Sequence, residues 1–194
     1  MARLATAAEP KEVATILARA FADDPVLTTF IGKGPKQTTR LTRYFELECR
    51  LGFQGYGEVW LDDDELGAAI WRRPGGYPEP VSAQLRMLPR YLLLFPREFV
   101  RASRAMNAAA RVHPREPHWY LFAVGVVPEA RGQGRGAALL EPVLRRCDQD
   151  GVPAYLEAST ADNARLYERL GFERRDELEM LPGLRVRPMW REPR

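Results

Sequence analysis

The chain has 194 residues, of which 45% are hydrophobic and 28% charged, a balance typical of one globular domain and not of a disordered chain. The formal net charge is only +3, and the cations are interspersed with acids, so no basic block indicates binding to nucleic acid. The first residues lack the apolar core of a signal peptide, and no run reaches the ~18 apolar residues of a membrane span. We therefore expect a cytoplasmic protein without a membrane partner.

The first half of the chain alternates segments with helical and with strand periodicity. Apolar residues recur every three or four positions before Asp23-Asp24-Pro25, which ends the first helical run. An acidic turn, Asp62-Asp63-Asp64, separates two strands. The next segment is rich in Pro and Arg, and we expect it to form a helical insertion over about residues 74–117. The elements expected in this half are helices at 9–21, 37–51, 81–94 and 98–111 and strands at 58–61 and 66–71.

The second half begins with HWYLFAVGVV, the strongest strand pattern of the chain. The apolar stripe of the following helix contains Pro142, so we expect the helix either to kink there or to be shaped in its first turns by a ligand. Gly171 marks the end of a short helix. The elements expected in this half are helices at 136–149 and 162–170 and strands at 118–127, 153–159, 172–178 and 186–190. This order predicts a single α/β domain, residues 1–194, built on a mixed sheet.

A loop rich in glycine and arginine, Arg131 to Gly136, joins the strand at 118–127 to the next helix. Such a loop binds phosphates, because free amides and the helix dipole both attract an anion. The absence of a lysine excludes a Walker phosphate loop. A dinucleotide fingerprint fits better, since Gly132, Gly134 and Ala137 match G-x-G-x-x-A. However, four residues precede Gly132 after the strand, and the roughly 60 residues that follow are too few for the further βαβ units of such a site.

A third pattern, [QR]-x-x-G-x-[GA], is met by RGQGRG between a strand and a helix, ahead of NARLYERLGF. In these features the chain resembles the GNAT superfamily of acetyl-CoA-dependent N-acetyltransferases. The resemblance implies the α/β GNAT fold, a mixed, mostly antiparallel sheet flanked by helices, with acetyl-CoA bound where the central strands splay. It also implies that the loop amides hold the coenzyme A pyrophosphate and that the preceding strand binds the pantetheine arm. The coenzyme-binding residues so implied are Val124, Val126, Val127, Arg131, Gly132, Gln133, Gly134, Arg135, Gly136, Ala137, Asn163 and Tyr167.

Longer stretches are similar to the puromycin N-acetyltransferases of this superfamily: LARAFADDP, GEVWLDDDELGAAIW, REPHWYLFAVGVVPEARGQGRG and GVPAYLEAS. The similarity also implies that Pro142 within its helix is a feature of that group. It is weakest across 28–54 and 74–112 and after Glu173, the regions expected to shape an acceptor pocket. The resemblance therefore implies an amine acceptor without identifying it as puromycin.

Acetyl transfer requires a base for the amine and a proton donor for the departing thiolate. Tyr167 is the candidate donor, because a phenol with a pKa of about 10 is protonated at neutral pH. Asn163 lies one turn earlier on the same helix face, and we expect Leu166 and Leu170 to face the core beside it. Packing at the core edge is the alternative role for Tyr167. Glu157 is the candidate base, and the alternative is a rim carboxylate paired with an arginine.

Two further features bear on the acceptor side of the site. A backbone amide near Val126 is the candidate hydrogen-bond donor to the oxyanion. Asp23 and Asp24 follow the first helix, where the family builds part of its acceptor site. They are candidates to attract a cationic amine, and ordinary solvated acids at a helix end are the alternative.

The histidines and cysteines indicate no metal site and no covalent nucleophile. His113 and His118 have no third ligand near them in the sequence, so we expect no metal. Cys49 and Cys147 lie far apart and show no redox spacing, which predicts two reduced thiols. No cysteine lies near the glycine loop, which favours direct attack of the amine on the thioester.

The sequence thus predicts transfer of an acetyl group from acetyl-CoA to a primary amine of a small molecule, in a ternary complex. A protein N-terminus or lysine as the acceptor is the first alternative, and a CoA-binding module without catalysis is the second. A dinucleotide-dependent oxidoreductase is a third alternative, and it predicts binding of NAD(P)H instead. A homodimer is compatible with the sequence.

Overall fold

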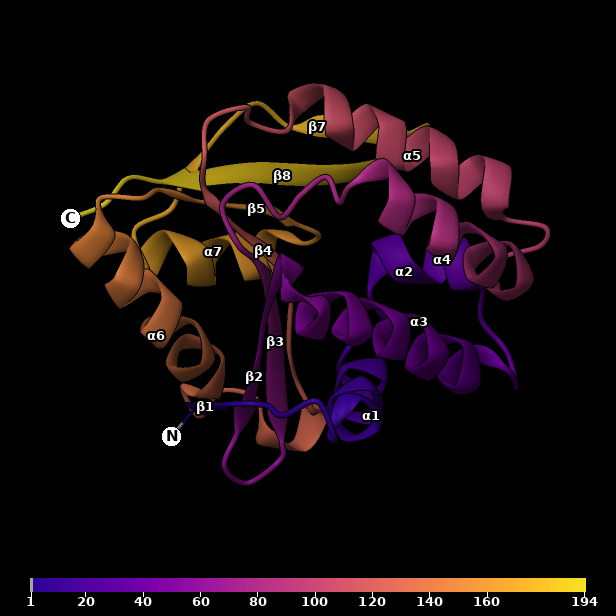
Figure 1. The fold of residues 1–194 in the computed structure, drawn as a ribbon, viewed down its shortest axis with the longest axis horizontal. Helices are drawn as coiled ribbons and strands as arrows, with labels where there is room; N and C mark the ends of the chain where they lie inside the picture. The colour runs from indigo at the N-terminus through magenta and orange to yellow at the C-terminus, as the bar shows by residue number, and fades with distance from the viewer. Residues whose placement is uncertain (1) are drawn as a thin grey trace.

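Residues 2–194, which the computed structural model describes, fold into an eight-stranded sheet with helices on both faces (Figure 1). The strands lie in the order β1-β2-β3-β4-β5-β8-β6, with β7 paired to β8. All neighbours are antiparallel except β4 and β5, which confirms the expected mixed, mostly antiparallel α/β sheet. The strands are β1 (Ala2–Leu4), β2 (Gly57–Asp62), β3 (Gly67–Arg72), β4 (Trp119–Val126), β5 (Ala154–Ala158), β6 (Glu173–Arg174), β7 (Leu178–Leu181) and β8 (Leu184–Arg191). The helices are α1 (Pro10–Ala20), α2 (Pro25–Ile31), α3 (Gln37–Leu51), α4 (Val81–Leu94), α5 (Phe99–Val112), α6 (Arg135–Asp150) and α7 (Ala161–Arg169), with a π-helical turn (Gly52–Tyr56) and a 3₁₀ turn (Pro128–Ala130).

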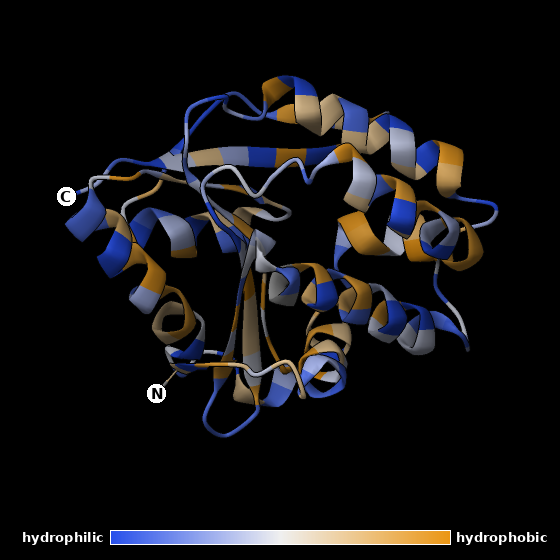
Figure 2. Cartoon of the chain, viewed as in Figure 1, coloured by the Kyte–Doolittle hydropathy of each residue, from blue (hydrophilic) through white to orange (hydrophobic). Residues whose placement is uncertain are grey.

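Two cores form because side chains alternate between the faces of the central strands. On β3, Ala68 and Ile70 pack with α1 and α3, whereas Ala69 and Trp71 pack with α6 and α7. Figure 2 shows apolar residues along these strands and a hydrophilic turn between β2 and β3. Complete burial of a side chain such as Ile70 contributes about 1.5–3 kcal/mol. The paired cores therefore hold the central strands, and with them the strand ends that border the site.

The central strands β4 and β5 separate soon after they begin. Within the described residues they pair only at Trp119 with Ala154 and at Tyr120 with Tyr155, although β4 continues beside β3 to its last residue, Val126. The later part of β4 therefore has a partner strand on one edge only. Because backbone donors and acceptors need hydrogen-bond partners, this open edge can bind a ligand, and it is the splay that the resemblance implied.

Helix α2 is not expected from the sequence, and Asp24 explains why. The segment Asp23-Asp24-Pro25 does follow the end of α1. In addition, the Asp24 carboxylate accepts hydrogen bonds from the amides of Val26 and Leu27, at 2.9 and 3.0 Å. An aspartate cap followed by proline is the start signal of a helix. The same residues therefore end α1 and begin α2.

The C-terminal region differs from expectation in three details. The strand expected at 172–178 is divided into β6 and β7, and the last strand, β8, is longer than expected. On α7 the buried residues are Ala164 and Tyr167, whereas Leu166 is only half-buried, so its assignment to the core is wrong. Leu170 packs at the edge of the second core. Helix α6 continues through Pro142 as a single helix, so the proline does not end it.

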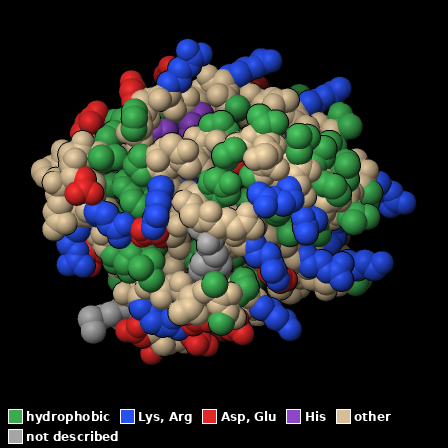
Figure 3. Space-filling model, in the orientation of Figure 1, with side chains coloured by type: hydrophobic (Ala, Val, Ile, Leu, Met, Phe, Trp, Pro, Cys, Tyr) green, Lys and Arg blue, Asp and Glu red, His purple; other side chains and the backbone are tan. Residues whose placement is uncertain are grey.

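The segment 74–117 contains α4 and α5, as the sequence predicts, and these helices pack over α3 and β7. Their outer surface carries exposed apolar side chains, among them Leu85, Leu93 and Val100. Figure 3 shows hydrophobic side chains gathered over this part of the molecule. Within residues 2–194 no helix has the length and hydrophobicity needed to span a bilayer.

Candidate active site

The loop between β4 and α6 forms an open cradle at the start of the helix. Gly132 and Gly134 have φ angles of 77° and 75°, which residues with a Cβ adopt only at a cost. A Cβ at either position would meet nothing within 4 Å, so backbone conformation and not crowding requires the glycines. Gly134 directly precedes α6, whose first amides have no partner within the helix. The loop therefore has the backbone geometry of an anion-binding helix start.

The end of β4 presents backbone groups to the same region. The Val127 amide donates to the Leu66 carbonyl at 2.9 Å, which directs it toward the β3 side. Since successive residues of a strand alternate, the amides of Val126 and Val124 point to the opposite, splayed edge. On that edge the Val126 carbonyl accepts a hydrogen bond from Nε of Arg131 at 3.3 Å. The splayed edge therefore offers outward-directed amides beside the loop.

The two arginines of the loop have different partners. Arg131 donates through Nη2 to the carbonyl of Ala20 at 2.8 Å, which ties the end of α1 to the loop. Arg135 pairs with Asp62, and with Asp64 at 2.8 Å, both in the acidic turn. These hydrogen bonds to Asp64 and Asp62 raise the pKa of Arg135. The charge of Arg135 is therefore compensated within the protein, which leaves Arg131 better placed to compensate a bound anion.

A cavity of about 740 Å³, called here the outer cleft, lies between this loop, the end of α1 and α7. Most of the sequence-predicted coenzyme residues line it: Val124, Val126, Arg131, Gly132, Gly134, Arg135, Gly136, Ala137, Asn163 and Tyr167. Val127 and Gln133 do not. The Val127 side chain is completely buried, and the Gln133 side-chain oxygen accepts a hydrogen bond from Arg135 at 3.2 Å.

Tyr167 borders the outer cleft from α7. Its residue surface is only 7% exposed, and its ring packs edge-on against Phe172 at 6.0 Å between centroids. Burial, and to a lesser degree the charge of Asp24, raises the pKa of Tyr167. The hydroxyl therefore remains protonated at neutral pH. One turn earlier, Asn163 is exposed, and its side-chain nitrogen lies 3.4 Å from the Ser159 hydroxyl.

The two acids after α1 both line the outer cleft, but their surroundings differ. Asp24 is engaged as the cap of α2, and it also borders a second, smaller cavity. Asp23 is exposed to solvent. The structural role of Asp24 as a helix cap is therefore clear, and both carboxylates lie where a cationic amine could pass.

The smaller cavity, called here the inner pocket, has a volume of about 140 Å³ and is lined by Glu157 together with Tyr167 and Asn163. The Glu157 side chain is 13% exposed, and its Oε1 lies 3.8 Å from Nδ1 of His113. No arginine pairs with Glu157 within residues 2–194, contrary to the alternative role of a rim carboxylate. Burial and then the charge of Glu157 raise the pKa of Tyr120. Glu157 is thus a carboxylate in a largely enclosed, aromatic setting.

His113 lies between Glu157 and a second histidine, His118. Its Nε2 lies 3.2 Å from Nε2 of His118, whose Nδ1 lies 2.7 Å from the carbonyl oxygen of Glu116. A carbonyl only accepts, so His118 carries its proton on Nδ1 and accepts at Nε2 from His113. Burial lowers the pKa of His118, which keeps it neutral. Figure 3 shows histidine atoms at the surface of the molecule. The described part of the chain has no cluster of three metal-binding side chains.

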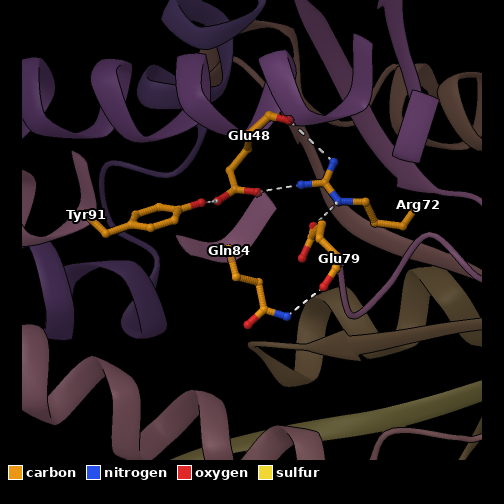
Figure 4. A network of polar contacts seen from close by, with 5 residues as sticks. All are labelled: Glu48, Arg72, Glu79, Gln84 and Tyr91. Atoms are coloured by element: carbon orange, nitrogen blue, oxygen red, sulfur yellow. Dashed lines mark hydrogen bonds and ion pairs between the residues drawn. The ribbon is translucent and has the colours of Figure 1, made fainter. Parts of the chain in front are cut away.

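A third cavity, of about 410 Å³, lies beneath α4 and α5 and is called here the insertion chamber. One patch of its wall is polar, as Figure 4 shows. Arg72 is completely buried and donates to Glu48 Oε2 at 2.5 Å and to Glu79 Oε1 at 3.1 Å. Tyr91 donates its hydroxyl to Glu48 Oε1 at 2.6 Å. Burial raises the pKa of Glu48.

Sequence reasoning did not identify the residues that surround Glu157 and line the chamber. His113 was considered only as a metal ligand, and Tyr120 was given no role beyond its place in the strand expected at 118–127. Glu48 did carry a signal, because it continues the apolar stripe of Leu41 and Phe45 at helical spacing. A carboxylate on a buried stripe requires a buried partner, which here is Arg72.

Comparisons with known proteins agree with this geometry. Residues 91–172 match the model of the acetyltransferase (GNAT) family. An uncharacterized N-acetyltransferase of Schizosaccharomyces pombe is 30% identical over 182 residues, which cover 88% of this chain and 73% of that protein. A crystal structure described as histone acetyltransferase HPA2 and related acetyltransferase, from Corynebacterium glutamicum, is 30% identical with a TM-score of 0.73 and covers 100% of this chain and 96% of that chain.

Arylalkylamine N-acetyltransferase 2 from Aedes aegypti has a TM-score of 0.67 over 100% of this chain and 99% of that chain. At 13% identity this likeness shows the fold alone. The relative from Schizosaccharomyces pombe, by contrast, is similar in sequence over most of both chains. Together with the splayed strands and the glycine loop, these findings lead to one conclusion: the chain belongs to the acetyltransferase (GNAT) family.

Proposed function

We propose that this acetyltransferase moves the acetyl group of acetyl-CoA to the primary amine of a small molecule. The observation that carries the proposal is the junction of two cavities, since the outer cleft and the inner pocket share Val124, Asn163 and Tyr167. A thioester held along β4 and an amine entering through the inner pocket would meet beside the Tyr167 hydroxyl. One side of the junction then serves the coenzyme and the other serves the acceptor.

The outer cleft has the properties that acetyl-CoA requires. The amides at the start of α6 suit its diphosphate, and the open edge of β4 suits the amide groups of its pantetheine arm. A volume of about 740 Å³ is within the range of ligand sites. Members of the family use acetyl-CoA as co-substrate, and it supplies the thioester carbonyl that the amine attacks.

The residues at the junction supply the proton transfers. Glu157 accepts the proton that the amine loses, directly or through a water, as an N–H bond breaks and an O–H bond forms on the carboxylate. The Val126 amide donates a hydrogen bond to the oxyanion that develops on the thioester carbonyl. Tyr167 gives its hydroxyl proton to sulfur as the C–S bond breaks, so coenzyme A leaves as a neutral thiol. The proton held by Glu157 then returns to Tyr167 through the inner pocket that both residues line.

Direct attack fits the state of the two cysteines. Cys49 and Cys147 are both buried, and burial raises the pKa of each thiol to about 12. A thiol with such a pKa is rarely a thiolate at neutral pH, so neither cysteine suits a covalent acetyl intermediate.

Two alternatives for the function remain. The relationship to a structure described as a histone acetyltransferase favours a protein acceptor. Against it, the inner pocket adjoins the insertion chamber beneath α4 and α5, and such an enclosed space suits a small molecule. A CoA-binding module without catalysis would not need Tyr167 and Glu157 at the junction.

The test is release of coenzyme A thiol from acetyl-CoA, measured against a panel of small primary amines and against peptides with a free N-terminus or lysine. We expect turnover with at least one small amine, and mass spectrometry should show one added acetyl group on it. Turnover with the peptides alone would show that the acceptor is a protein and not a small molecule. Tight binding of acetyl-CoA without turnover of any amine or peptide would support the non-catalytic module.

A further inference from the structure

The insertion chamber adjoins the proposed site of acetyl transfer. It shares Tyr44, Tyr77 and Phe122 with the inner pocket, which in turn shares Tyr167 and other residues with the outer cleft. The three cavities therefore lie next to one another in succession, from the glycine loop past Tyr167 to the space beneath α4 and α5. A molecule whose amine lies at Tyr167 can extend from the inner pocket toward the insertion chamber.

The walls of the chamber are mostly aromatic and aliphatic. Side chains from four helices contribute to the lining, for example Phe30, Tyr44, Met87, Tyr91, Phe95 and Met106. Aromatic and methionine side chains pack well against flat, polarizable groups. A volume of about 410 Å³ lies within the range of small-ligand sites. The chamber therefore suits a bulky apolar body, and a linear polyamine would leave these walls without a complementary surface.

The charged groups on the chamber wall are acidic. Among the described residues that line it, only Glu48 and Glu79 are charged. Both Glu48 oxygens accept hydrogen bonds, which fits the ionised carboxylate. Arg72 lies behind this wall and compensates one of the two carboxylates, and its guanidinium also stacks over Phe122, at 4.7 Å from the ring centroid. One negative charge therefore remains uncompensated at the wall.

We propose that the insertion chamber binds the body of the acceptor, and that the acceptor is a primary amine with a bulky aromatic body that carries no carboxylate. The apolar lining selects the aromatic body, and the acidic patch of Glu48 and Glu79 repels an anionic one. This inference rests on the proposed acetyl transfer to a small amine. It adds the class of that amine and gives the insertion, residues 74–117, the role of an acceptor-binding wall.

The first test compares matched amines by kcat/KM in the thiol-release assay. We expect the kcat/KM values of 2-phenylethylamine and tryptamine to be ~10-fold or more above those of butylamine and spermidine, in line with the discrimination between substrates that apolar pockets achieve. L-Phenylalaninamide should have a higher kcat/KM than L-phenylalanine, which carries a carboxylate in place of the amide. The Glu79→Gln variant should show a smaller ratio between these two kcat/KM values. Equal rates for aromatic and linear amines, or a preference for L-phenylalanine, would overturn the proposal.

The second test fills the chamber without touching the junction. Ala102 lines the chamber from α5, whereas Ala108 on the same helix lines none of the three cavities. We expect Ala102→Phe to weaken binding of 2-phenylethylamine by ~10-fold or more, as measured by ligand-observed NMR with coenzyme A present. Ala108→Phe should not change it, and both variants should bind acetyl-CoA as the wild type does.

The binding readout separates the two proposals. If 2-phenylethylamine binds and Ala102→Phe abolishes binding, but no thiol is released, the chamber proposal holds while acetyl transfer to this amine fails. If acetyl transfer to amines occurs and folded Ala102→Phe binds and acetylates 2-phenylethylamine as the wild type does, the chamber proposal is wrong while the proposed function holds.

Discussion

Replacement of Tyr167 by phenylalanine isolates the proton-donor role, because it removes one oxygen and leaves the ring. The ring packs against Phe172, and the Tyr167 hydroxyl forms no hydrogen bond to any of the residues 2–194. We therefore expect the free energy of unfolding to change by no more than about 1 kcal/mol. With the residue only 7% exposed, bulk water is poorly placed to replace the lost donor. A positioned acid contributes about 10²–10⁴-fold, so we expect kcat to fall by roughly 100-fold, or about 2.7 kcal/mol.

The assay is steady-state thiol release at saturating acetyl-CoA, with calorimetry to measure the dissociation constant of acetyl-CoA. We expect a lower kcat with unchanged acetyl-CoA affinity, since the hydroxyl acts on the leaving thiolate. Tyr56→Phe, in the π-helical turn before β2, is the matched control, and we expect it to retain the wild-type kcat. A folded Tyr167→Phe enzyme with a kcat within threefold of wild type would refute the assignment of Tyr167 as the acid.

Three further changes test other parts of the account. Glu157→Gln should lower kcat by about 100-fold at neutral pH, if the carboxylate is the base; a kcat equal to that of the wild type would return Glu157 to a structural role. Gly134→Val should weaken acetyl-CoA binding by ~10-fold or more in calorimetry, because a β-branched residue at φ 75° strains the anion cradle; unchanged affinity would contradict that role. Arg146→Met should destabilise the fold by about 1.5 kcal/mol in urea denaturation, because it removes the nearest hydrogen-bond donor to the buried Glu58 carboxylate, at 2.6 Å, while Arg73 and Trp60 still donate to it. Burial alone would raise the pKa of Glu58, but the hydrogen bond and charge of Arg146 lower it overall. The stability that this pair contributes should therefore be present at neutral pH and lost as the pH falls through that lowered pKa. A stability difference between wild type and Arg146→Met that does not shrink in acid would contradict the assignment.

The histidine pair provides a spectroscopic prediction. The chain has two histidines, so ring ¹⁵N signals can be assigned with single variants. Because the Glu116 carbonyl lies 2.7 Å from Nδ1 of His118, long-range ¹H–¹⁵N spectra should show His118 as the neutral Nδ1–H tautomer at pH 7. Observation of the Nε2–H tautomer would show that His118 does not donate to the Glu116 carbonyl and instead donates to His113.

Much of the fold could be predicted from local sequence, because periodicity and turn residues act locally. The helices of the insertion, α6 with its apolar stripe, and the long strand β4 follow from spacing alone. Helix α2 could not, because the same Asp24-Pro25 pair is a stop signal for one helix and a start signal for the next. The inward face of α7 was also misjudged, since tertiary packing turned Tyr167 and not Leu166 toward the core.

The two sides of the site differ in how far the sequence predicts them. The coenzyme side depends on one contiguous loop, so its residues can be named from a motif, and the alternating direction of the β4 amides follows from strand geometry. The acceptor side is assembled from α2, α3, α4, α5 and β4, which are distant in the chain. Contacts such as Arg72 with Glu48 and Glu79, or His113 with Glu157, exist only after the sheet brings these segments together.

The central claim is that the loop from Arg131 to Gly136 and the splayed edge of β4 hold acetyl-CoA. Separate calorimetric titrations of acetyl-CoA and of NADH into the purified protein test it most directly. We expect saturable binding of acetyl-CoA with one site per chain, weakened by Gly134→Val, and no heat of binding with NADH. Binding of NADH with none of acetyl-CoA would contradict the account, and the dinucleotide alternative for the glycine loop would take its place.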